Sequence, residues 1–516
     1  MTKALAAGRA VVRASDPTTA RAASSGGEPP ESRPSRSRRD GLVLAGLVAL
    51  AAALYAAFSL LRFRAFQAGT YDLVIFDQAI RSYSGFGAPV AMVKGVHNGF
   101  GPDFSILGDH FSPLLALLAP LYWIHDGPAT LLVAQAVLFA LAIVPIWRYA
   151  RRRLGRASAY LVAGAYALSW PIAEAVAFDF HEVAFVPFLT ALLIERYDAG
   201  RRGQAALAAT ALLLVKEDAG LLLAGLGFVL LTRRGERIVG GACVAAGIAA
   251  TWISSRVMIA AFGGDNAYYW AYGSLGEDMP SAALHILTHP WAVPAALGSP
   301  SVKLVTVALL VLPLLLLPLR SPLSLAVLPM LAERMLADQF PNWWEPKYHY
   351  NAFLIAILVM AAVDGAYRLR RSRLLRRAGT ALGRAAAGRL GAELPAAALF
   401  TAAVAALPFF AFGDLADPGL YRLDERARAA AAAVSVVPDG ALVETVNNLG
   451  PALSGRTKVL LWDREPRRAP WVVADTARFS FPFRSLAEQR ERVGELIDGG
   501  YRPVFRRTGY VVLTRD

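Results

Sequence analysis

Residues 41–61 read "GLVLAGLVALAAALYAAFSLL", and this stretch decides the class of fold. An uninterrupted apolar run of this length can cross the ~30 Å hydrocarbon core of a bilayer as a helix. The basic segment "RPSRSRRD" (33–40) precedes it, which predicts that the N-terminus stays in the cytoplasm. The run is too long for a signal peptide. Residues 1–40 are rich in Ala, Arg, Ser, Pro and Gly, which is typical of a disordered tail.

The composition agrees with a membrane protein. The chain has 516 residues, of which 56% are hydrophobic and only 18% are charged, and its mean hydropathy is +0.42. A soluble protein would carry about 25% charged residues. The net charge of +14 lies largely in short runs beside apolar segments, the distribution of a positive-inside protein, so no nucleic-acid partner is predicted. The single cysteine, Cys243, excludes an intramolecular disulfide.

The apolar runs predict a polytopic α-helical membrane protein of about eleven crossings. Residues 203–232 fit only as two short helices of roughly 12–14 residues, with a tip at 216–218 that needs protein or water around it. Residues 111–124 are short and proline-interrupted, and we expect them to lie in the outer interface. The remaining predicted spans are 41–61, 127–148, 157–177, 182–197, 238–261, 302–319, 321–337, 351–367 and 394–413.

Three regions follow from this reading: a basic cytoplasmic tail (1–40), a transmembrane domain (41–413) with a long outer loop (62–126), and an extracytoplasmic domain (414–516). In the last of these, "ALVETV", "VLLWD" and "WVVADT" have the pattern of strands. The segment "SLAEQRERVGELIDGG" is an amphipathic helix, and "YRPVFRRTGYVVLTRD" is a hairpin. The C-terminal part is therefore predicted to be a small α/β domain. The alanine and arginine usage is typical of a high-GC bacterial source, so the expected location is a bacterial cell membrane.

Polar residues concentrate in the predicted outer loops, where ionisable groups at a membrane edge are functional candidates. Each also has a structural interpretation: Asp72 as a helix cap, Asp77 as a solvated residue, the histidines as hydrogen-bonded interfacial groups, the 216–218 tip as a local ion pair, and the aromatic residues near 343–350 as membrane anchors. The candidates are Asp72, Asp77, Gln78, Asp109, His110, Asp179, His181, Glu182, Lys216, Glu217, Asp218, Lys347 and His349.

No compact metal or nucleotide motif is present. The chain has no HExxH, CxxC, Walker loop or GxSxG. Asp and His side chains from separate loops remain a plausible ligand set for Mg²⁺ or Mn²⁺, which favour oxygen and imidazole donors. The sequence identifies neither a metal nor another cofactor, and it does not fix an oligomeric state.

The order of these motifs resembles the GT-C superfamily of polyprenyl-phosphate-sugar-dependent glycosyltransferases. An acidic outer-loop motif, "YDLVIFDQ", is followed by "GDHFSPLLALLAPLYW", a lysine-tipped helix pair, "LLLVKEDAGLLL", and a tyrosine-rich span start, "KYHYNAFLIAIL". Together with "FDFHEVAF", these segments look like the uncharacterised membrane-protein family called domain of unknown function two thousand and seventy-nine. The resemblance covers about residues 50–370. The acidic doublet usual at this position of the superfamily is not present here.

The resemblance implies transfer of a sugar from a lipid-linked phosphate donor in the outer leaflet to an envelope acceptor, with inversion. It implies Asp72 as general base, with Asp77 as second candidate. A carboxylate shielded from water is a stronger base, and nearby cations offset charge on a leaving phosphate. The substrate-binding set would be Gln78, Asp109, His110, His181, Glu182, Lys216, Glu217, Lys347 and His349.

Two other functions remain open from the sequence. A transporter or lipid flippase would use the same polar residues without cleaving a bond, although transporters often carry repeated halves and no repeat is found here. A non-catalytic membrane scaffold would display the C-terminal domain. The glycosyltransferase reading predicts that Asp72, His110, His181, Lys216 and Lys347 line one outward-facing cavity.

Overall fold

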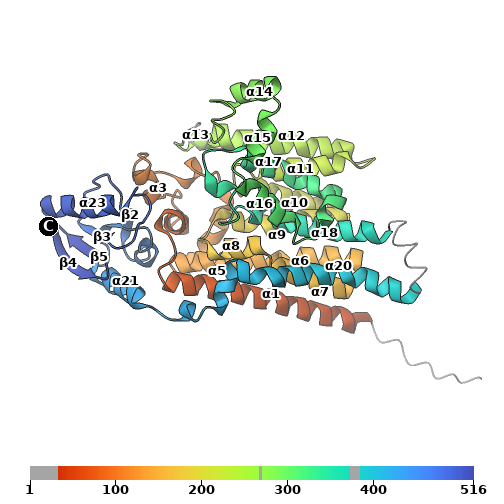
Figure 1. Ribbon diagram of the computed structural model, residues 1–516, viewed down its shortest axis with the longest axis horizontal. Helices are drawn as coiled ribbons and strands as arrows, with labels where there is room; N and C mark the ends of the chain where they lie inside the picture. Colours follow the sequence, from red (N-terminus) through yellow and green to blue (C-terminus); the bar gives the residue numbers. More distant parts are fainter. Residues whose placement is uncertain (1–32, 266–269, 372–383, 516) are drawn as a thin grey trace, which may run out of the picture. The chain divides into compact units, whose positions relative to one another are not determined.

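The computed structural model of the protein describes residues 33–265, 270–371 and 384–515 (Figure 1). The predicted disordered tail lies almost wholly outside these residues, as does part of the basic run 368–377. Residues 46–516 form one compact unit, and residues 33–45 are the first turns of helix α1. Because α1 begins at Arg33, the helix starts before the predicted boundary at residue 41.

Helices dominate the described chain. The α-helices are α1 (Arg33–Arg64), α2 (Ile75–Ser84), α3 (Met92–His97), α4 (Ala119–Tyr122), α5 (Pro128–Leu141), α6 (Ile143–Leu154), α7 (Arg156–Ala167), α8 (Trp170–Ala177), α9 (Phe185–Asp198), α10 (Arg202–Leu213), α11 (Gly220–Leu231), α12 (Arg237–Ile253), α13 (Ile259–Ala261), α14 (Met279–Thr288), α15 (Ala292–Gly298), α16 (Val302–Val311), α17 (Leu328–Leu336), α18 (Ala352–Arg371), α20 (Arg384–Ala406), α21 (Glu425–Val436), α22 (Gly450–Leu453) and α23 (Leu486–Asp498).

Short 3₁₀-helical and π-helical segments lie between these helices. The π-helical segments are η1 (Thr70–Val74) and η5 (Ser254–Met258). The 3₁₀ segments are η2 (Ile106–Gly108), η3 (Pro113–Leu118), η4 (Glu182–Ala184), η6 (Leu317–Arg320), η7 (Pro322–Val327), η8 (Pro341–Trp343), η9 (Leu407–Phe409), η10 (Ala411–Ala416) and η11 (Pro418–Tyr421).

In the part of the chain that the structure describes, four helices are long and apolar enough to cross a membrane: Arg38–Arg64, Pro128–Leu154, Arg237–Ala261 and Ala352–Arg371. A fifth crossing results if α15 and α16, which meet at 77°, are one bent span. The count of about eleven is therefore not confirmed. Breaks at serine and proline explain much of the difference, since the predicted span 157–177 divides into α7 and α8 at Ser169, before Pro171.

The predicted short helix pair is confirmed. Helices α10 and α11 have 12 residues each, and the tip at 216–218 lies between them. Helix α11 packs closely on α12 because glycines face each other. A Cβ atom at Gly220 would collide with the backbone of Gly247, and one at Gly227 would collide with that of Gly240. Small residues of this kind let helices approach without side chains between them.

Helix α18 forms the centre of the helical part. Every residue from 352 to 366 is buried, so this helix contacts protein on all sides, whereas α12 exposes large apolar side chains. Ile238 is 89% exposed and Trp252 60% exposed. A soluble protein rarely leaves a long apolar helix face uncovered, and such a face fits contact with lipid.

The predicted C-terminal strands, helices and hairpin are confirmed. Strands β1 (Leu442–Thr445), β2 (Lys458–Leu461), β3 (Trp471–Asp475), β4 (Arg502–Arg507) and β5 (Tyr510–Thr514) form a sheet in the order β2-β1-β3-β5-β4. Strand β1 is parallel to β2 and β3, whereas β5 is antiparallel to β3 and β4. Thr508 and Gly509 both have positive φ and form the two-residue hairpin turn.

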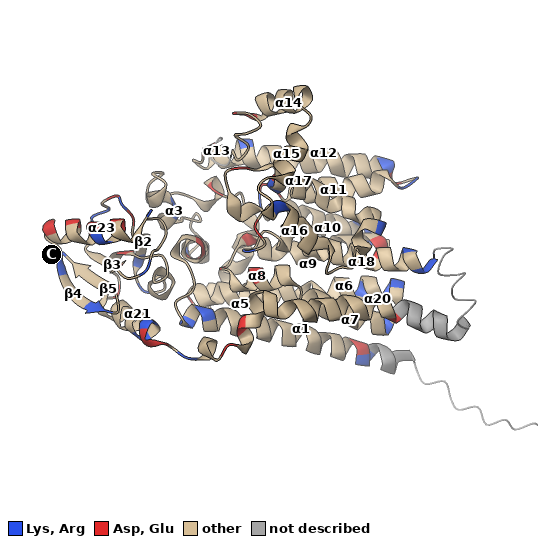
Figure 2. Ribbon diagram, in the orientation of Figure 1, with Lys and Arg blue, Asp and Glu red and all other residues tan. Residues whose placement is uncertain are grey.

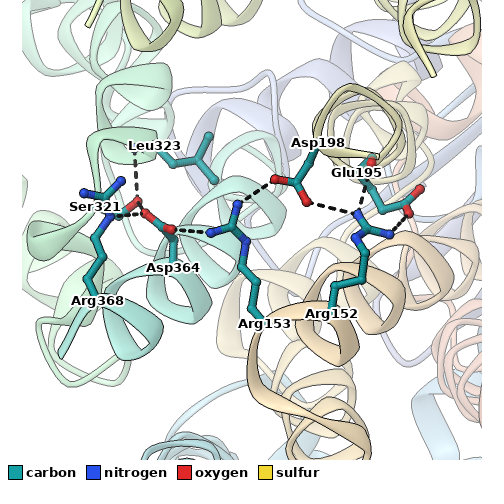
Figure 3. Close-up of polar contacts among 8 residues, drawn as sticks. All are labelled: Arg152, Arg153, Glu195, Asp198, Ser321, Leu323, Asp364 and Arg368. Atoms are coloured by element: carbon teal, nitrogen blue, oxygen red, sulfur yellow. Dashed lines mark hydrogen bonds and ion pairs between the residues drawn. The ribbon is translucent and has the colours of Figure 1, made fainter. Parts of the chain in front are cut away.

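Basic residues lie at the C-terminal ends of several helices in the unit 46–516 (Figure 2). Figure 3 shows Arg153 of α6 between Asp198 of α9, at 2.6 Å, and Asp364 of α18, at 2.7 Å. Arg152 pairs with Glu195 and Asp198, while Asp364 also accepts from Ser321 and Arg368. The basic runs 148–156, 195–202 and 368–371 therefore share one end of the fold.

Candidate functional site

The carboxylate of Asp72 faces an imidazole. Asp72 lies in the π-helical turn η1, and its side chain is 34% exposed. Its Oδ1 atom lies 3.4 Å from Nε2 of His181. Nδ1 of His181 lies 3.1 Å from the backbone oxygen of Asp179 and can donate to it. Burial lowers the pKa of His181, but the interactions with Asp72 outweigh it and raise the value, so His181 favours the doubly protonated form.

His181 stacks on a second histidine. The ring centroids of His181 and His349 are 3.7 Å apart with an interplanar angle of 21°, and Phe178 stacks on both. Burial, together with the positive charges of His181 and Lys216, lowers the pKa of His349 well below its ordinary value. The pKa values of two stacked imidazoles are therefore shifted in opposite directions. Among the described residues, Nδ1 of His349 is buried without a hydrogen-bond partner.

The tip between α10 and α11 holds a buried ammonium. Nζ of Lys216 lies 3.0 Å from Glu182, 3.2 Å from Glu217 and 2.7 Å from Nδ1 of His110. Nδ1 of His110 also lies 3.1 Å from Glu217, and its Nε2 faces Asp109 at 3.8 Å. Burial and Lys216 lower the pKa of His110, but these two carboxylates outweigh them and raise it. Burial would raise the pKa of Glu182, but Lys216 lowers it.

A second lysine extends this chain of contacts through Asp109. Nζ of Lys94 lies 3.0 Å from Oδ1 of Asp109 and 3.0 Å from the hydroxyl of Tyr71, directly beside Asp72 in sequence. Lys94 is only 3% exposed. A buried carboxylate therefore holds Lys94 inside the protein.

Eight of the eleven predicted site residues belong to this connected set, which we call the outer cluster. Its members from the prediction are Asp72, Asp109, His110, His181, Glu182, Lys216, Glu217 and His349.

The other three predicted site residues lie elsewhere. Asp77 is fully buried, pairs with Arg81 at 2.8 Å and accepts from the hydroxyl of Tyr122; burial raises its pKa despite these partners. Gln78 joins α2 to strand β2 and to α3 through backbone groups of Val459 and Val93. Lys347 is exposed, and the interaction that the structure shows for it is with Glu174. The prediction that Lys347 shares a site with Lys216 is not supported by these contacts.

Asp179 contacts the backbone turn before Asp72, which its sequence motif did not indicate. Its Oδ2 atom accepts from the backbone N–H of Gly69 at 2.6 Å, three residues before Asp72. Burial and the charge of Asp72 raise the pKa of Asp179 to about 7. Two carboxyl groups therefore flank the same backbone turn in different environments: Asp179 enclosed and Asp72 partly open.

Arg334 is a member of the outer cluster that the sequence reading missed. It is 3% exposed, lies 3.9 Å from Asp218 and donates to the backbone oxygen of Tyr350. The sequence does contain a pattern that indicates Arg334. Glu333 and Arg334 interrupt the otherwise apolar run 328–336, and charges inside an apolar span are rare unless partnered. Within the described ranges no group of three or more His, Cys, Asp or Glu side chains has the arrangement of a metal site.

The fold and the outer cluster together define a helical membrane protein that collects buried charges where α9, α11 and α18 begin. The chain belongs to the family described as "Predicted membrane protein (DUF2079)", which matches residues 62–512. The match extends beyond the resemblance in the sequence and includes most of the C-terminal α/β region. No curated protein matches the chain significantly.

Solved structures give weaker likenesses. ArnT from Cupriavidus metallidurans bound to undecaprenyl phosphate has 13% identity and a TM-score of 0.49, and the alignment covers 91% of this chain and 98% of that one. The Archaeoglobus fulgidus oligosaccharyltransferase tethered with an acceptor peptide has 12% identity and a TM-score of 0.38, with 91% and 74% covered. At these scores the likeness does not define the fold of this chain.

Proposed function

We propose that the protein is a membrane glycosyltransferase, which moves a sugar from a polyprenyl-phosphate donor to an envelope acceptor at the outer face of the membrane. One observation carries the proposal. The partly exposed carboxylate of Asp72 faces His181 at 3.4 Å, and the next residue, Glu182, pairs with the buried Lys216 at 3.0 Å. A base and a cationic region are thus adjacent, as transfer from a lipid phosphate to a hydroxyl requires.

The reaction assigned to this site is a single displacement. The acceptor hydroxyl loses its proton to the Asp72 carboxylate, and its oxygen forms the new bond to the anomeric carbon. The bond from that carbon to the phosphate oxygen breaks on the opposite side, and the polyprenyl phosphate leaves with the electron pair. Contact with Asp72 raises the pKa of His181, which lies where its protonated form can stabilise negative charge near the reacting atoms.

Lys216 contributes mainly through its electrostatic field. An ammonium has three N–H donors, and Glu182, Glu217 and His110 surround this one at hydrogen-bond distance. Direct contact with a phosphate oxygen would displace one of these partners. Glu217 is the natural one to yield, since its distance of 3.2 Å is the longest of the three.

The test is a transfer assay on the reconstituted full-length protein with radiolabelled polyprenyl-phosphate sugars and an envelope extract. We expect Asp72→Asn to lower the rate by about 100- to 10,000-fold, the usual contribution of a general base. Asp103→Asn is the matched control, because Asp103 is an exposed carboxylate of the same outer loop. Loss of transfer in Asp77→Asn with full activity in Asp72→Asn would overturn the assignment of the base.

The rival functions have their own outcomes in the same preparation. Movement of the labelled lipid across the vesicle without sugar transfer would identify a flippase. Neither transfer nor movement, with capture of an envelope protein by the full-length chain, would identify a scaffold.

A further inference from the structure

The C-terminal α/β region, residues 425–515, contacts the loop that carries Asp72. Residues 446–448 follow directly after strand β1, which lies between two parallel neighbours, β2 and β3. The carboxyl ends of parallel strands are where α/β proteins usually bind ligands. Here the chain's own residues 69–71 occupy that edge.

Asn447 makes three of these contacts. Its backbone oxygen accepts from the N–H of Thr70 at 2.6 Å and from the Thr70 hydroxyl at 2.5 Å. Its side-chain Oδ1 accepts from the N–H of Tyr71 at 2.9 Å. Two consecutive backbone N–H groups immediately before Asp72 are therefore held by one residue that is more than 370 positions away in sequence.

Two glycines permit this close approach. A Cβ atom at Gly450 would overlap the side chain of Thr70, and one at Gly69 would lie 3.0 Å from Oδ2 of Asp179 and 3.2 Å from Nδ2 of Asn447. The turn before Asp72 is thus enclosed by Asp179 on the side of the helices and by Asn447 on the side of the sheet.

Further contacts fix the same edge of the sheet to the outer loop. Nδ1 of His97 lies 2.9 Å from Asp463, which follows strand β2, and Gln78 donates to the backbone oxygen of Val459 at 3.0 Å. Tyr71 packs edge-on against Phe481 with ring centroids 5.2 Å apart. The C-terminal region is therefore docked on this loop at several points, and the side chain of Asn447 binds the backbone N–H of Tyr71, directly before Asp72.

The carboxylate of Asp72 depends on this support. Its side chain is 34% exposed, and its contact with His181 at 3.4 Å is longer than an ordinary charged hydrogen bond. Its direction is set largely by the backbone of η1. We propose that Asn447 is a positioning residue for Asp72, and that the C-terminal region serves to hold the catalytic turn. The expected effect of Asn447 on the transfer rate rests on the proposed function, whereas its expected effect on the order of the turn before Asp72 does not.

The experiment compares Asn447→Ala, Asn447→Asp and Asn448→Ala in the full-length protein. The aspartate variant keeps an oxygen acceptor for the N–H of Tyr71. Asn448 is the matched control: its amide donates to the Tyr510 hydroxyl at 3.1 Å and to the backbone oxygen of Phe66 at 3.4 Å, so its removal takes away a donor and leaves the N–H groups of Thr70 and Tyr71 with their acceptors. Asn448→Ala tests whether a general loosening of the C-terminal region changes exchange and rate as much as Asn447→Ala does.

Two readouts are needed. Hydrogen exchange of a peptide covering residues 66–76 should be about tenfold faster in Asn447→Ala, since a buried donor loses its acceptor. It should stay within about threefold of the wild type in Asn447→Asp and Asn448→Ala. In the transfer assay, Asn447→Ala should lower kcat by about 10- to 100-fold with little change in the KM of the lipid donor, as expected for a misplaced base.

The outcomes separate the two proposals. Unchanged exchange in Asn447→Ala, or equal acceleration in Asn448→Ala, would overturn the positioning role. An equal loss through KM rather than kcat would also overturn it. If the wild type transfers no sugar, the proposed function fails, while the exchange result still decides whether Asn447 holds the turn.

Discussion

Replacing Lys216 by methionine tests whether the outer cluster is a balanced set of buried charges. The ammonium lies 3.0 Å from Glu182 and 3.2 Å from Glu217, and the side chains of the two acids are 2% and 13% exposed. Removing one partner of a buried ion pair costs about 3–5 kcal/mol, because the remaining charge has neither water nor a counterion. We expect Lys216→Met to lose about this much free energy of unfolding at pH 8.

The loss of stability in Lys216→Met should depend on pH in one direction. Burial would raise the pKa values of Glu182 and Glu217, but Lys216 lowers both below 4.5, so their stabilising contribution is present above pH 4.5 and is lost as the pH falls through the lowered values. Without the lysine, burial is opposed by the neighbouring histidines, chiefly His110, and no longer by an ammonium, so the pKa values of both carboxyls rise toward the protonated form. The loss of stability in Lys216→Met should therefore shrink between pH 8 and pH 5.

The assay is a denaturing-detergent titration of the purified protein at pH 5 and pH 8. Lys303→Met is the matched control, since Lys303 is 1% exposed and donates to the backbone oxygens of Ala296 and Ala337 rather than to a carboxylate. We expect it to cost about 1–3 kcal/mol at both pH values. Adding Glu182→Gln to Lys216→Met should recover about 0.5–3 kcal/mol at pH 8.

Two results would contradict this reasoning. If Lys216→Met unfolds at the same detergent fraction as the wild type at pH 8, the lysine is not what compensates the buried acids. If the loss is as large at pH 5 as at pH 8, it comes from packing of the side chain rather than from uncompensated charge.

Two further predictions concern other buried charges. Burial raises the pKa of Glu444 to about 7. The wild type should therefore lose up to about 3 kcal/mol of its free energy of unfolding as the pH rises from 4.5 to 7. Glu444→Gln should remove this loss, as measured by hydrogen exchange of strand β1. Arg153→Met should cost about 3–5 kcal/mol in the detergent titration, because it leaves Asp198 and Asp364 without their shared partner; Asp364→Asn in the same chain should restore part of it, and no recovery would contradict the pairing.

The parts of the fold that sequence could predict are those with strong local patterns. The C-terminal strands carry β-branched runs bounded by turn residues, and the helix after Ser485 begins with a side-chain cap on Glu488 and ends at two glycines. The short pair around 216–218 followed from basic residues at both ends of an apolar run. These signals depend only on neighbouring residues.

The number of membrane crossings could not be predicted in the same way. Apolar content does not distinguish a spanning helix from a short helix buried by protein. Helix α9 has 14 residues and is about 20 Å long, less than the ~30 Å of a hydrocarbon core, and most of its residues are buried. Such a segment reads like a span in sequence because its environment is apolar protein.

Within the site, motif order pointed to residues that directly precede a helix, but it carries no information on residues whose partners are distant in the chain. His181 and Lys216 belong to the outer cluster, whereas Lys347, only two residues before His349, is exposed and acts on Glu174. Asn447 had no local signal at all, since its role comes from the docking of two segments far apart in the chain.

The placement of the outer cluster at helix beginnings explains how it can hold so many acids. Glu182 precedes α9, Asp218 precedes α11 and His349 precedes α18, and the pairs Lys216–Glu182 and His181–His349 bring these three beginnings together. The N-terminal end of a helix carries about half a positive charge, and three such ends favour anions at the same place. Within the protein, carboxylates are the anions that these helix ends stabilise. A lipid phosphate that replaced one of the carboxylates would be stabilised in the same way. The same field would oppose a cationic substrate, so a preference for anionic lipids over cationic ones in binding to the reconstituted protein follows from the backbone as much as from the lysines.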